Sequence, residues 1–380
     1  MLRELETEGK GVALAAAVEP DLARAEEARK QYVIPVFATI DELLRADLKL
    51  DAACVAVPTV KHHEAAGALL DAGIDLLVEK PLAANLAEAD DLIERAGRGG
   101  RILQPGHLER FNPAVLAVQP NLIRPMFFEA HRLSVFTPRS LDVDVVLDLM
   151  IHDLDIVLTF AKSPVREVRA VGLPILSPKV DIANVRVELE SGCVANFTAS
   201  RVSTERVRKL RFFEPGQYVS MDYARRDVLV IKVDPPAVGQ TFGQGSSNSA
   251  LAAMAAEFVA TGKVDSAAIQ KLMATGKVPA TLVMKVLAAK NDPEKLKEIA
   301  KGVAGTSDGL APGLTFVKPE ITPGEPLKLE ISSFLHAVRT RHQPQVTAQQ
   351  GRAALELALT IQATMAAHAE RAGLGDFFKN

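Results

Sequence analysis

The chain has 380 residues, of which 48% are hydrophobic, and 44 basic against 47 acidic residues give it a formal net charge of −3. Its length predicts two domains, and its hydrophobic content is too high for a disordered chain. The balanced charge argues against a protein that binds nucleic acid through the phosphate backbone. Its two cysteines and the lack of an apolar run of roughly 18 residues argue against a disulfide framework and a membrane span, so we expect a cytoplasmic protein.

The first third of the chain alternates short apolar segments with helical ones. Strands are expected at residues 12–18, 36–37, 51–57, 74–78 and 101–104, with helices at 21–31, 40–46, 61–72 and 85–97 between them. Such strands predict a parallel sheet covered by helices on both faces. Ligands of these sheets bind beyond the carboxyl ends of the strands, so the residues there should line one crevice. They are Glu19, Pro58, Thr59, Glu79, Lys80, Pro81, Gly106 and His107.

From about residue 113 onward, turn residues separate a series of short strands. They are expected at residues 126–135, 165–172, 183–190, 194–200, 209–214, 218–223 and 228–233, with helices at 145–160, 327–338 and 348–372. Strands joined by tight turns predict an open, mainly antiparallel sheet. We therefore expect an α/β domain over residues 1–112 and an α+β domain over residues 113–380. Residues from about 240 to 310 are interpreted as an insertion between two strands of that sheet.

Lys80 is the first candidate for chemistry. It follows a buried strand directly, and burying an ammonium group costs several kcal/mol unless the group is paired. Pro81 biases Lys80 toward an extended conformation. A charged exit from a strand is also common in α/β proteins, so this position alone leaves both interpretations open.

Asp148 and His152 are the second candidate, because residues four apart on the predicted helix 145–160 share a face. Asp148 could hold the imidazole in one tautomer and raise its basicity, as a general base requires. The alternative is an exposed surface pair, but this helix is apolar nearly all round. Metal binding through His152, Asp153 and Asp155 matches no known ligand spacing, so no metal is expected.

Three further segments carry weaker signals. His107, Arg110 and Asn112 follow the last parallel strand and form either a domain linker or an active-site wall. Glu19 ends the first strand, where a ribose-binding acid lies in dinucleotide-binding folds. The basic stretch 201–211 is most often a solvated strand face, and the alternative is a site for an anionic substrate group such as a diphosphate.

Together these residues resemble the glucose–fructose oxidoreductase/inositol dehydrogenase (Gfo/Idh/MocA) family. The segment Glu79–Pro81 matches the EKP motif of that family, and Asp148 with His152 matches its DxxxH pair. The segment Pro58–His62 resembles the loop that contacts the nicotinamide half of the cofactor. The resemblance covers residues 12–155 and 327–367, and it implies a Rossmann-like domain followed by the α+β domain.

The resemblance implies an NAD-dependent oxidoreductase that oxidises a ring hydroxyl of a sugar or nucleotide sugar to a ketone by hydride transfer. His152 would be the general base, Lys80 would hydrogen-bond the reacting oxygen, and Asp148 would orient His152. The segments 106–114 and 148–155 further resemble members that act on the 3-hydroxyl of UDP-N-acetylglucosamine. A homodimer or homotetramer is also implied.

The resemblance also assigns binding residues. The implied cofactor-binding residues are Glu19, Pro58, Thr59, His62, Glu79, Lys80 and Pro81. A carboxylate at Glu19 would bind the ribose diol and repel a 2′-phosphate, so NAD is expected rather than NADP. The implied substrate-binding residues are Lys80, His107, Arg110, Asn112 and His152.

One departure from the family concerns the start of the sequence. The family begins with a strand and a GxGxxG turn that holds the pyrophosphate, and residues 1–8 resemble only the end of the helix that follows. About 20–25 residues are missing by this comparison, and because the absent strand is central we expect a gap in the sheet. Either the start codon is assigned too late or the chain cannot hold a dinucleotide in the usual way. The alternative function is a non-catalytic ligand-binding or scaffold protein on the same fold.

Overall fold

The computed structural model describes Leu5 and residues 11–137, 143–233 and 314–374. The chain divides into two compact units, residues 1–230 with 318–380 and residues 231–317. All described helices belong to the first unit. The predicted insertion at about 240–310 lies outside the described residues. The boundary between residues 112 and 113 stays a prediction.

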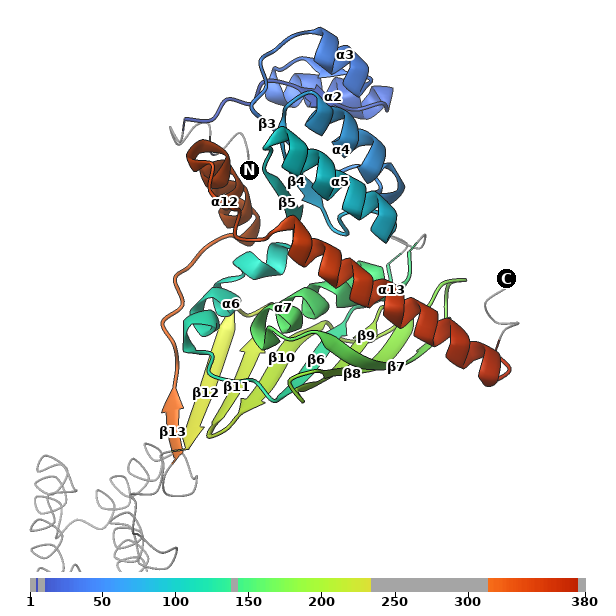
Figure 1. Cartoon of the computed structure of the whole chain (residues 1–380), viewed down its shortest axis with the longest axis vertical. Coiled ribbons are helices and arrows are strands. Elements are labelled where there is room, and N and C mark those ends of the chain that lie inside the picture. Colours follow the sequence, from blue (N-terminus) through green and yellow to red (C-terminus); the bar gives the residue numbers. More distant parts are fainter. Residues whose placement is uncertain (1–4, 6–10, 138–142, 234–313, 375–380) are drawn as a thin grey trace, which may run out of the picture. The chain divides into compact units, whose positions relative to one another are not determined.

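The first part of the chain forms the predicted alternation of strands and helices (Figure 1). Its elements are β1 (Ala17–Val18), α2 (Leu22–Tyr32), β2 (Val36–Phe37), α3 (Ile40–Arg45), β3 (Ala52–Val55), η1 (Thr59–Lys61), α4 (His62–Asp71), β4 (Asp75–Glu79), α5 (Leu86–Gly99) and β5 (Leu103–Gly106). Every strand pair among them is parallel, because each helical crossover returns the chain to the start of the next strand. The predicted Rossmann-like parallel arrangement is confirmed.

These strands form two separate sheets, β1–β2 and β3–β4–β5. Within the described residues no strand pairing joins β1 to β3. The strand β1 is shorter than predicted because its partner β2 has only two residues. Both residues of β1 are half-buried, whereas the first four residues of β4 are fully buried.

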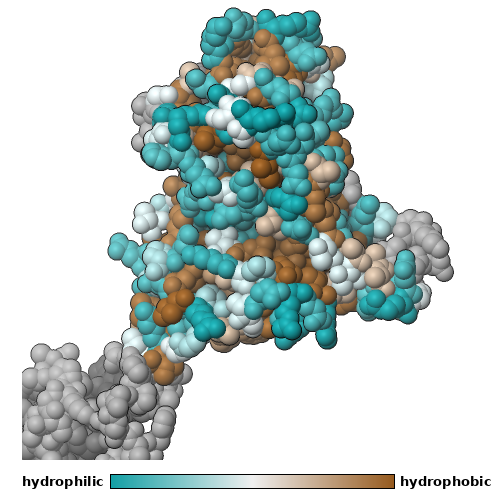
Figure 2. Space-filling view, in the orientation of Figure 1, coloured by the Kyte–Doolittle hydropathy of each residue, from teal (hydrophilic) through white to brown (hydrophobic). Residues whose placement is uncertain are grey.

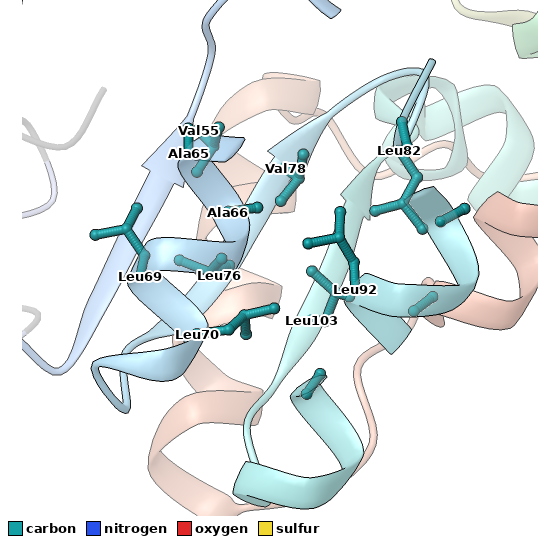
Figure 3. Close-up of a cluster of buried hydrophobic side chains, with 14 of the residues drawn as sticks. Val55, Ala65, Ala66, Leu69, Leu70, Leu76, Val78, Leu82, Leu92 and Leu103 are labelled. Carbon is teal, nitrogen blue, oxygen red and sulfur yellow. The ribbon is translucent and has the colours of Figure 1, made fainter. Parts of the chain in front are cut away.

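An aliphatic core fills one face of the β3–β4–β5 sheet (Figure 3). Leu69 and Leu70 of α4 and Leu92 of α5 pack with Leu76 and Leu103 of the sheet, and each is at most 5% exposed. Burying one leucine contributes about 1.5–3 kcal/mol, so this layer supplies much of the stability of the domain.

The other face of this sheet is covered by a helix from the end of the chain, α12 (Pro326–Thr340). Its side chains Ile331 and Phe334 form a second core with Leu77, which alternates with Leu76 and therefore points to the opposite face. Arg341, directly after α12, binds the carboxylate of Asp75 at the start of β4. The first domain is thus completed by residues distant in the sequence.

A third sheet, called the second sheet below because it follows the parallel strands in the chain, contains eight strands. Its strands are β6 (Phe127–Leu133), β7 (Val165–Leu173), β8 (Ile182–Leu189), β9 (Val194–Ser200), β10 (Val207–Glu214), β11 (Gln217–Asp222), β12 (Asp227–Val233) and β13 (Leu314–Val317). The helical elements η2 (Leu108–Phe111), α6 (Pro113–Val118) and η3 (Gln119–Asn121) precede β6. The turn η4 (Val146–Met150) and α7 (Ile151–Ala161) lie between β6 and β7, and α13 (Ala348–Arg371) follows α12. The strand order is β13-β12-β11-β10-β6-β9-β8-β7. The pair β6–β9 is parallel, and the pairs β7–β8, β8–β9, β6–β10 and β10–β11 are antiparallel, which confirms a mainly antiparallel sheet.

The helices α7 and α13 lie on one face of this sheet (Figure 1). On α7, Phe160 meets the buried Phe212 of β10 edge to face, with ring centroids 5.9 Å apart. Near its start α13 approaches β5 so closely that a Cβ on Gly351 would come 2.5 Å from the side chain of Pro105. A glycine at that position therefore lets one helix contact both sheets.

The exposed apolar side chains belong to different elements. Val33, Val60 and Ile123 are 83%, 75% and 75% exposed, and each comes from a separate segment. Figure 2 shows hydrophobic and hydrophilic residues interspersed on the face that it draws. Scattered exposed apolar residues are normal for a folded domain. Among the described helices, none is long and apolar enough to span a bilayer.

Candidate active site

The three parallel strands β3, β4 and β5 end at one edge of their sheet. Their register pairs Val55 with Val78 and Glu79 with Gly106, so the residues that follow the strands emerge side by side. Lys80 follows Glu79 directly. The edge predicted to line a ligand crevice is therefore built from neighbouring strand ends.

His62, at the start of α4, holds two of these strand exits together. It is 1% exposed. Its Nδ1 lies 2.8 Å from the carbonyl oxygen of Pro81, and its Nε2 lies 2.9 Å from that of Val57. The Lys80–Pro81 peptide bond, which is cis, lies at this clamp. His62, predicted to bind the cofactor, thus has both ring nitrogens on backbone carbonyls, and its role in the structure is to position the two loops.

The side chain of Lys80 reaches from β4 to the helix that carries the predicted base. It is 20% exposed. Its Nζ donates to the carbonyl oxygens of Asp148 at 2.7 Å and Leu147 at 3.4 Å, and lies 3.9 Å from Asp148 Oδ1. Burial lowers the pKa of Lys80, while the carboxylates of Asp148 and Glu79 oppose that shift. The predicted functional lysine is therefore a largely buried, paired cation.

The carbonyl groups that accept from Lys80 belong to the π-helical turn η4. A continuous helix was predicted here, and hydrophobic periodicity does not distinguish a π turn from an α turn. Such widened turns occur mostly at functional sites. Asp144 Oδ1 starts the turn by accepting from the backbone N–H groups of Val146 and Leu147, at 2.9 and 3.1 Å. Gln362 of α13 donates to the other oxygen of Asp144.

His152 lies in the first turn of α7 and is half-buried. Its Nδ1 is shielded from solvent and has no hydrogen-bond partner in the described part of the chain. Burial lowers the pKa of His152 well below its usual value, and the positive charges of Lys80 and Arg132 act in the same direction. At neutral pH the imidazole is therefore uncharged, which is the form that accepts a proton.

Asp148 lies next to Lys80. Its Oδ1 is 3.9 Å from Lys80 Nζ, and its backbone carbonyl oxygen accepts from the same ammonium group at 2.7 Å. The orientation of His152 by Asp148 stays a prediction.

His107 and Arg110 lie in the segment that leaves β5. His107 is 1% exposed, and within the described residues neither of its ring nitrogens has a hydrogen-bond partner. Arg110, 4% exposed, binds Asp155 and Thr159 of α7 and lies 3.4 Å from Gln350 Oε1 in α13. The Arg110 guanidinium thus fixes this segment against both helices. Substrate contact by His107 and Arg110 stays a prediction.

A buried ion cluster that the sequence did not reveal surrounds Arg132 of β6. The Arg132 guanidinium, 3% exposed, donates to both carboxylate oxygens of Asp153, at 2.8 and 2.9 Å, and to Glu109 at 2.9 Å. It also stacks on the ring of Tyr223, 5.1 Å from its centroid. The amide of Asn112 donates to Glu109 and to the carbonyl oxygen of Tyr223, at 3.0 and 3.1 Å, so the structure gives Asn112 an internal role. Its predicted substrate contact stays a prediction.

The residues predicted to bind the rest of a cofactor come from different sheets. Glu19 follows β1, and its carboxylate accepts from the backbone N–H of Asp21 at 2.9 Å and lies 3.6 Å from Arg24. Thr59 begins η1 after β3, and Pro58 before it is exposed. Because β1 and β3 belong to separate sheets, no strand pairing places Glu19 against Thr59 in the described residues.

Two parts of the sequence match models of one protein family. Residues 1–107 match the GFO_IDH_MocA model, described as an oxidoreductase family with an NAD-binding Rossmann fold. Residues 124–213 match the GFO/IDH/MocA C-terminal domain. The first match covers the parallel strands β1 to β5, and the second covers β6 to β9 and most of β10 in the eight-stranded sheet. The chain belongs to the Gfo/Idh/MocA family.

Individual relatives in this family are dehydrogenases. A UDP-N-acetylglucosamine 3-dehydrogenase from Acidithiobacillus ferrooxidans is 38% identical over 211 residues, which are 55% of this chain and 66% of that protein. A scyllo-inositol 2-dehydrogenase (NAD(+)) from Bacillus subtilis is 24% identical over 216 residues, 53% of this chain and 63% of that protein. The matches therefore span less than two thirds of the length of either relative.

Solved structures share the fold over nearly the whole chain. A UDP-N-acetylglucosamine 3-dehydrogenase from Acidithiobacillus ferrooxidans superposes with a TM-score of 0.72 at 26% identity, covering 100% of this chain and 95% of the other. A WlbA dehydrogenase from Chromobacterium violaceum, in complex with NADH and UDP-GlcNAcA, has a TM-score of 0.64 at 13% identity, covering 96% and 89%. The second likeness shows the fold alone.

The role of His62 as a clamp can be measured through stability. Replacing His62 by alanine leaves the carbonyl groups of Pro81 and Val57 without their partner, so we expect the free energy of unfolding to fall by about 1–3 kcal/mol. His63→Ala is the matched control, since His63 is on the same helix but half-buried, and its bond to Asp91 should contribute less than about 1 kcal/mol. Equal losses in urea denaturation of the two variants would contradict the clamp.

The cluster around Arg132 predicts a larger loss. Arg132→Met leaves the carboxylates of Asp153 and Glu109 buried without their cation, so we expect a loss of about 3–5 kcal/mol in the free energy of unfolding. Arg166→Met removes an exposed pair with Glu188 and should cost less than about 1 kcal/mol. If thermal and urea denaturation show equal losses of stability in the two variants, the buried ion pairs do not hold β6 to α7.

Proposed function

We propose that this chain is an NAD-dependent dehydrogenase that oxidises a ring hydroxyl of a nucleotide sugar. The observation that carries the proposal is the convergence of Lys80 and His152 from the two sheet domains. Lys80 contacts the turn that leads into the His152 helix, and its charge helps to keep His152 neutral. A protonated donor and a neutral acceptor at one place are what the removal of a hydroxyl proton requires.

The residues present fit the nicotinamide half of a dinucleotide. Buried polar atoms without partners mark a site that a ligand can complete, and His152 Nδ1 and both ring nitrogens of His107 are such atoms among the described residues. Lys80, Pro81, Pro58 and Thr59 would hold the nicotinamide side. When bound, NAD supplies a hydride acceptor.

In this proposal the chain's own residues handle the proton and the developing charge. His152, neutral at physiological pH, accepts the proton of the substrate hydroxyl. The Lys80 ammonium group donates a hydrogen bond to the same oxygen as negative charge develops on it. His62 and Arg110 position the loops that carry Lys80 and His107. Glu19 would bind the adenosine ribose diol, which favours NAD over NADP.

The substrate we propose is UDP-N-acetylglucosamine, oxidised at its 3-hydroxyl. The support is the 38% identity to the Acidithiobacillus ferrooxidans enzyme of that name and the structural match to a protein with the same activity. A homodimer or homotetramer, which the family resemblance implies, is also part of the proposal. A cytoplasmic location stays a prediction.

Substitution of the two central residues tests the assignment. With NAD and UDP-N-acetylglucosamine, His152→Asn should lower kcat by about 100- to 10,000-fold because the base is lost, and Lys80→Met by about 100- to 1,000-fold because the oxyanion loses its donor. Lys30→Met is the control, since Lys30 is exposed on α2 and forms a surface pair with Glu26. Reduction of NAD followed by absorbance gives the rates.

Two outcomes of that assay separate the possible failures. Full activity in both variants would remove Lys80 and His152 from the mechanism while leaving the dehydrogenase assignment intact. A folded wild-type chain that binds UDP-N-acetylglucosamine in calorimetry but neither binds nor reduces NAD would instead support the non-catalytic ligand-binding alternative.

The pH profile of the wild-type enzyme provides an independent check. His152 must be neutral to act, and its pKa lies well below 6.5, so activity should persist below that pH and fall only in more acidic solution. Lys80 must be protonated to donate, and its pKa is lowered from 10.5, so activity should decline on the alkaline side before that pH is reached. A profile of kcat/KM with limbs at the ordinary histidine and lysine values would contradict these roles.

A further inference from the structure

The basic stretch 201–211 is divided by the structure into groups with different surroundings. Arg201 is 4% exposed and donates to Asp181 and to the carbonyl oxygen of Val143, so it is part of the domain framework. Arg211 lies 3.8 Å from Glu129 on β6. The alternation of side chains along β10 places Arg208 on the other face of the sheet from Arg211.

Arg208 lies on the face that carries the proposed site. It shares that face with Leu210 and Phe212, which are buried, and Phe212 contacts α7. The register between β10 and β6 pairs Arg208 with Arg132, whose guanidinium binds α7 one residue beyond His152. The charge of Arg208 is also among those that lower the pKa of His152. Arg208 is therefore within electrostatic range of the proposed base.

Arg208 differs from the other arginines around the site, because no partner for its side chain is found among the residues that the structure describes. Arg110, Arg132 and Arg201 are buried and each binds a carboxylate. Arg208 is exposed, and in the described ranges of the chain no carboxylate or hydrogen-bond acceptor pairs with its side chain. Its guanidinium group has all its donors available to a ligand, and that planar group suits bidentate binding of a phosphate.

We propose that Arg208 binds the diphosphate of a nucleotide-sugar substrate. The inference rests on the proposed function and names a specificity residue for it. The diphosphate is attached to C1 of the sugar, two carbon–carbon bonds from C3, so a phosphate-binding group must lie close to the base that acts on the 3-hydroxyl. Arg208 satisfies that condition by its register next to Arg132. A sugar without a phosphate would forgo this contact.

Calorimetry with UDP as the probe tests this role without requiring turnover. Arg208→Gln should weaken the binding of UDP by about 10- to 100-fold, as expected for a lost charged hydrogen bond, and should reduce the salt dependence of binding. Lys209→Gln is the matched control, because Lys209 is the next residue of β10 and points to the opposite face. We expect this control to bind UDP like the wild type, and Arg208→Lys to retain part of the affinity.

The remaining arms distinguish sources of the phosphate and separate the two proposals. NAD titrated into the same variants should bind alike in all of them, and a loss of NAD affinity in Arg208→Gln with unchanged UDP affinity would overturn the assignment in favour of the cofactor. Equal affinity of the wild type for UDP and uridine, or equal UDP affinity in wild type and Arg208→Gln, would also overturn it. If Arg208→Gln selectively loses UDP binding while the wild type reduces no NAD, the role of Arg208 is upheld and the dehydrogenase assignment is rejected.

Discussion

The site depends on the burial of one ammonium group. Lys80 is only 20% exposed, and a buried cation persists only where acceptors replace water. The carbonyl oxygens of Leu147 and Asp148 provide these acceptors, and they come from the turn η4 rather than from the parallel sheet that carries Lys80. The same contact therefore satisfies the charge and fixes the strand end against the helix that bears His152. Burial still outweighs the nearby carboxylates, which is why the pKa of Lys80 is lowered.

The electrostatics of His152 follow from this arrangement. Burial is the largest cause of the lowered pKa of His152, and the charge of Lys80 comes next. Arg132 acts in the same direction, although Asp153 and Glu109 both bind its guanidinium group. The result is a base that stays neutral at physiological pH, with its pKa lowered by burial and by the positive charges around the ring.

The sequence was sufficient for the elements and insufficient for the contacts between them. Apolar periodicity located most strands and helices to within a few residues, although it missed α6 and β13 and made β1 too long. The strand-end rule singled out Lys80 before any geometry was known. The sequence could not show that His62 contacts two loops or that Arg132 donates to Asp153. These contacts join segments up to 21 residues apart and leave no periodic signal. The π turn at η4 was invisible for a related reason, since its apolar pattern is that of an ordinary helix.

The end of the chain completes the core of the β3–β4–β5 sheet. This sheet has one hydrophobic cluster on each face, and residues of α12 build the second cluster. Helix α12 covers the second face of β4, but it does so with Glu330 as well as with apolar side chains. Burial, followed by the charge of Glu79, raises the pKa of Glu330 to about 8, so this carboxyl group is largely protonated at neutral pH. A neutral Glu330 is compatible with an apolar interface in a way that a carboxylate is not.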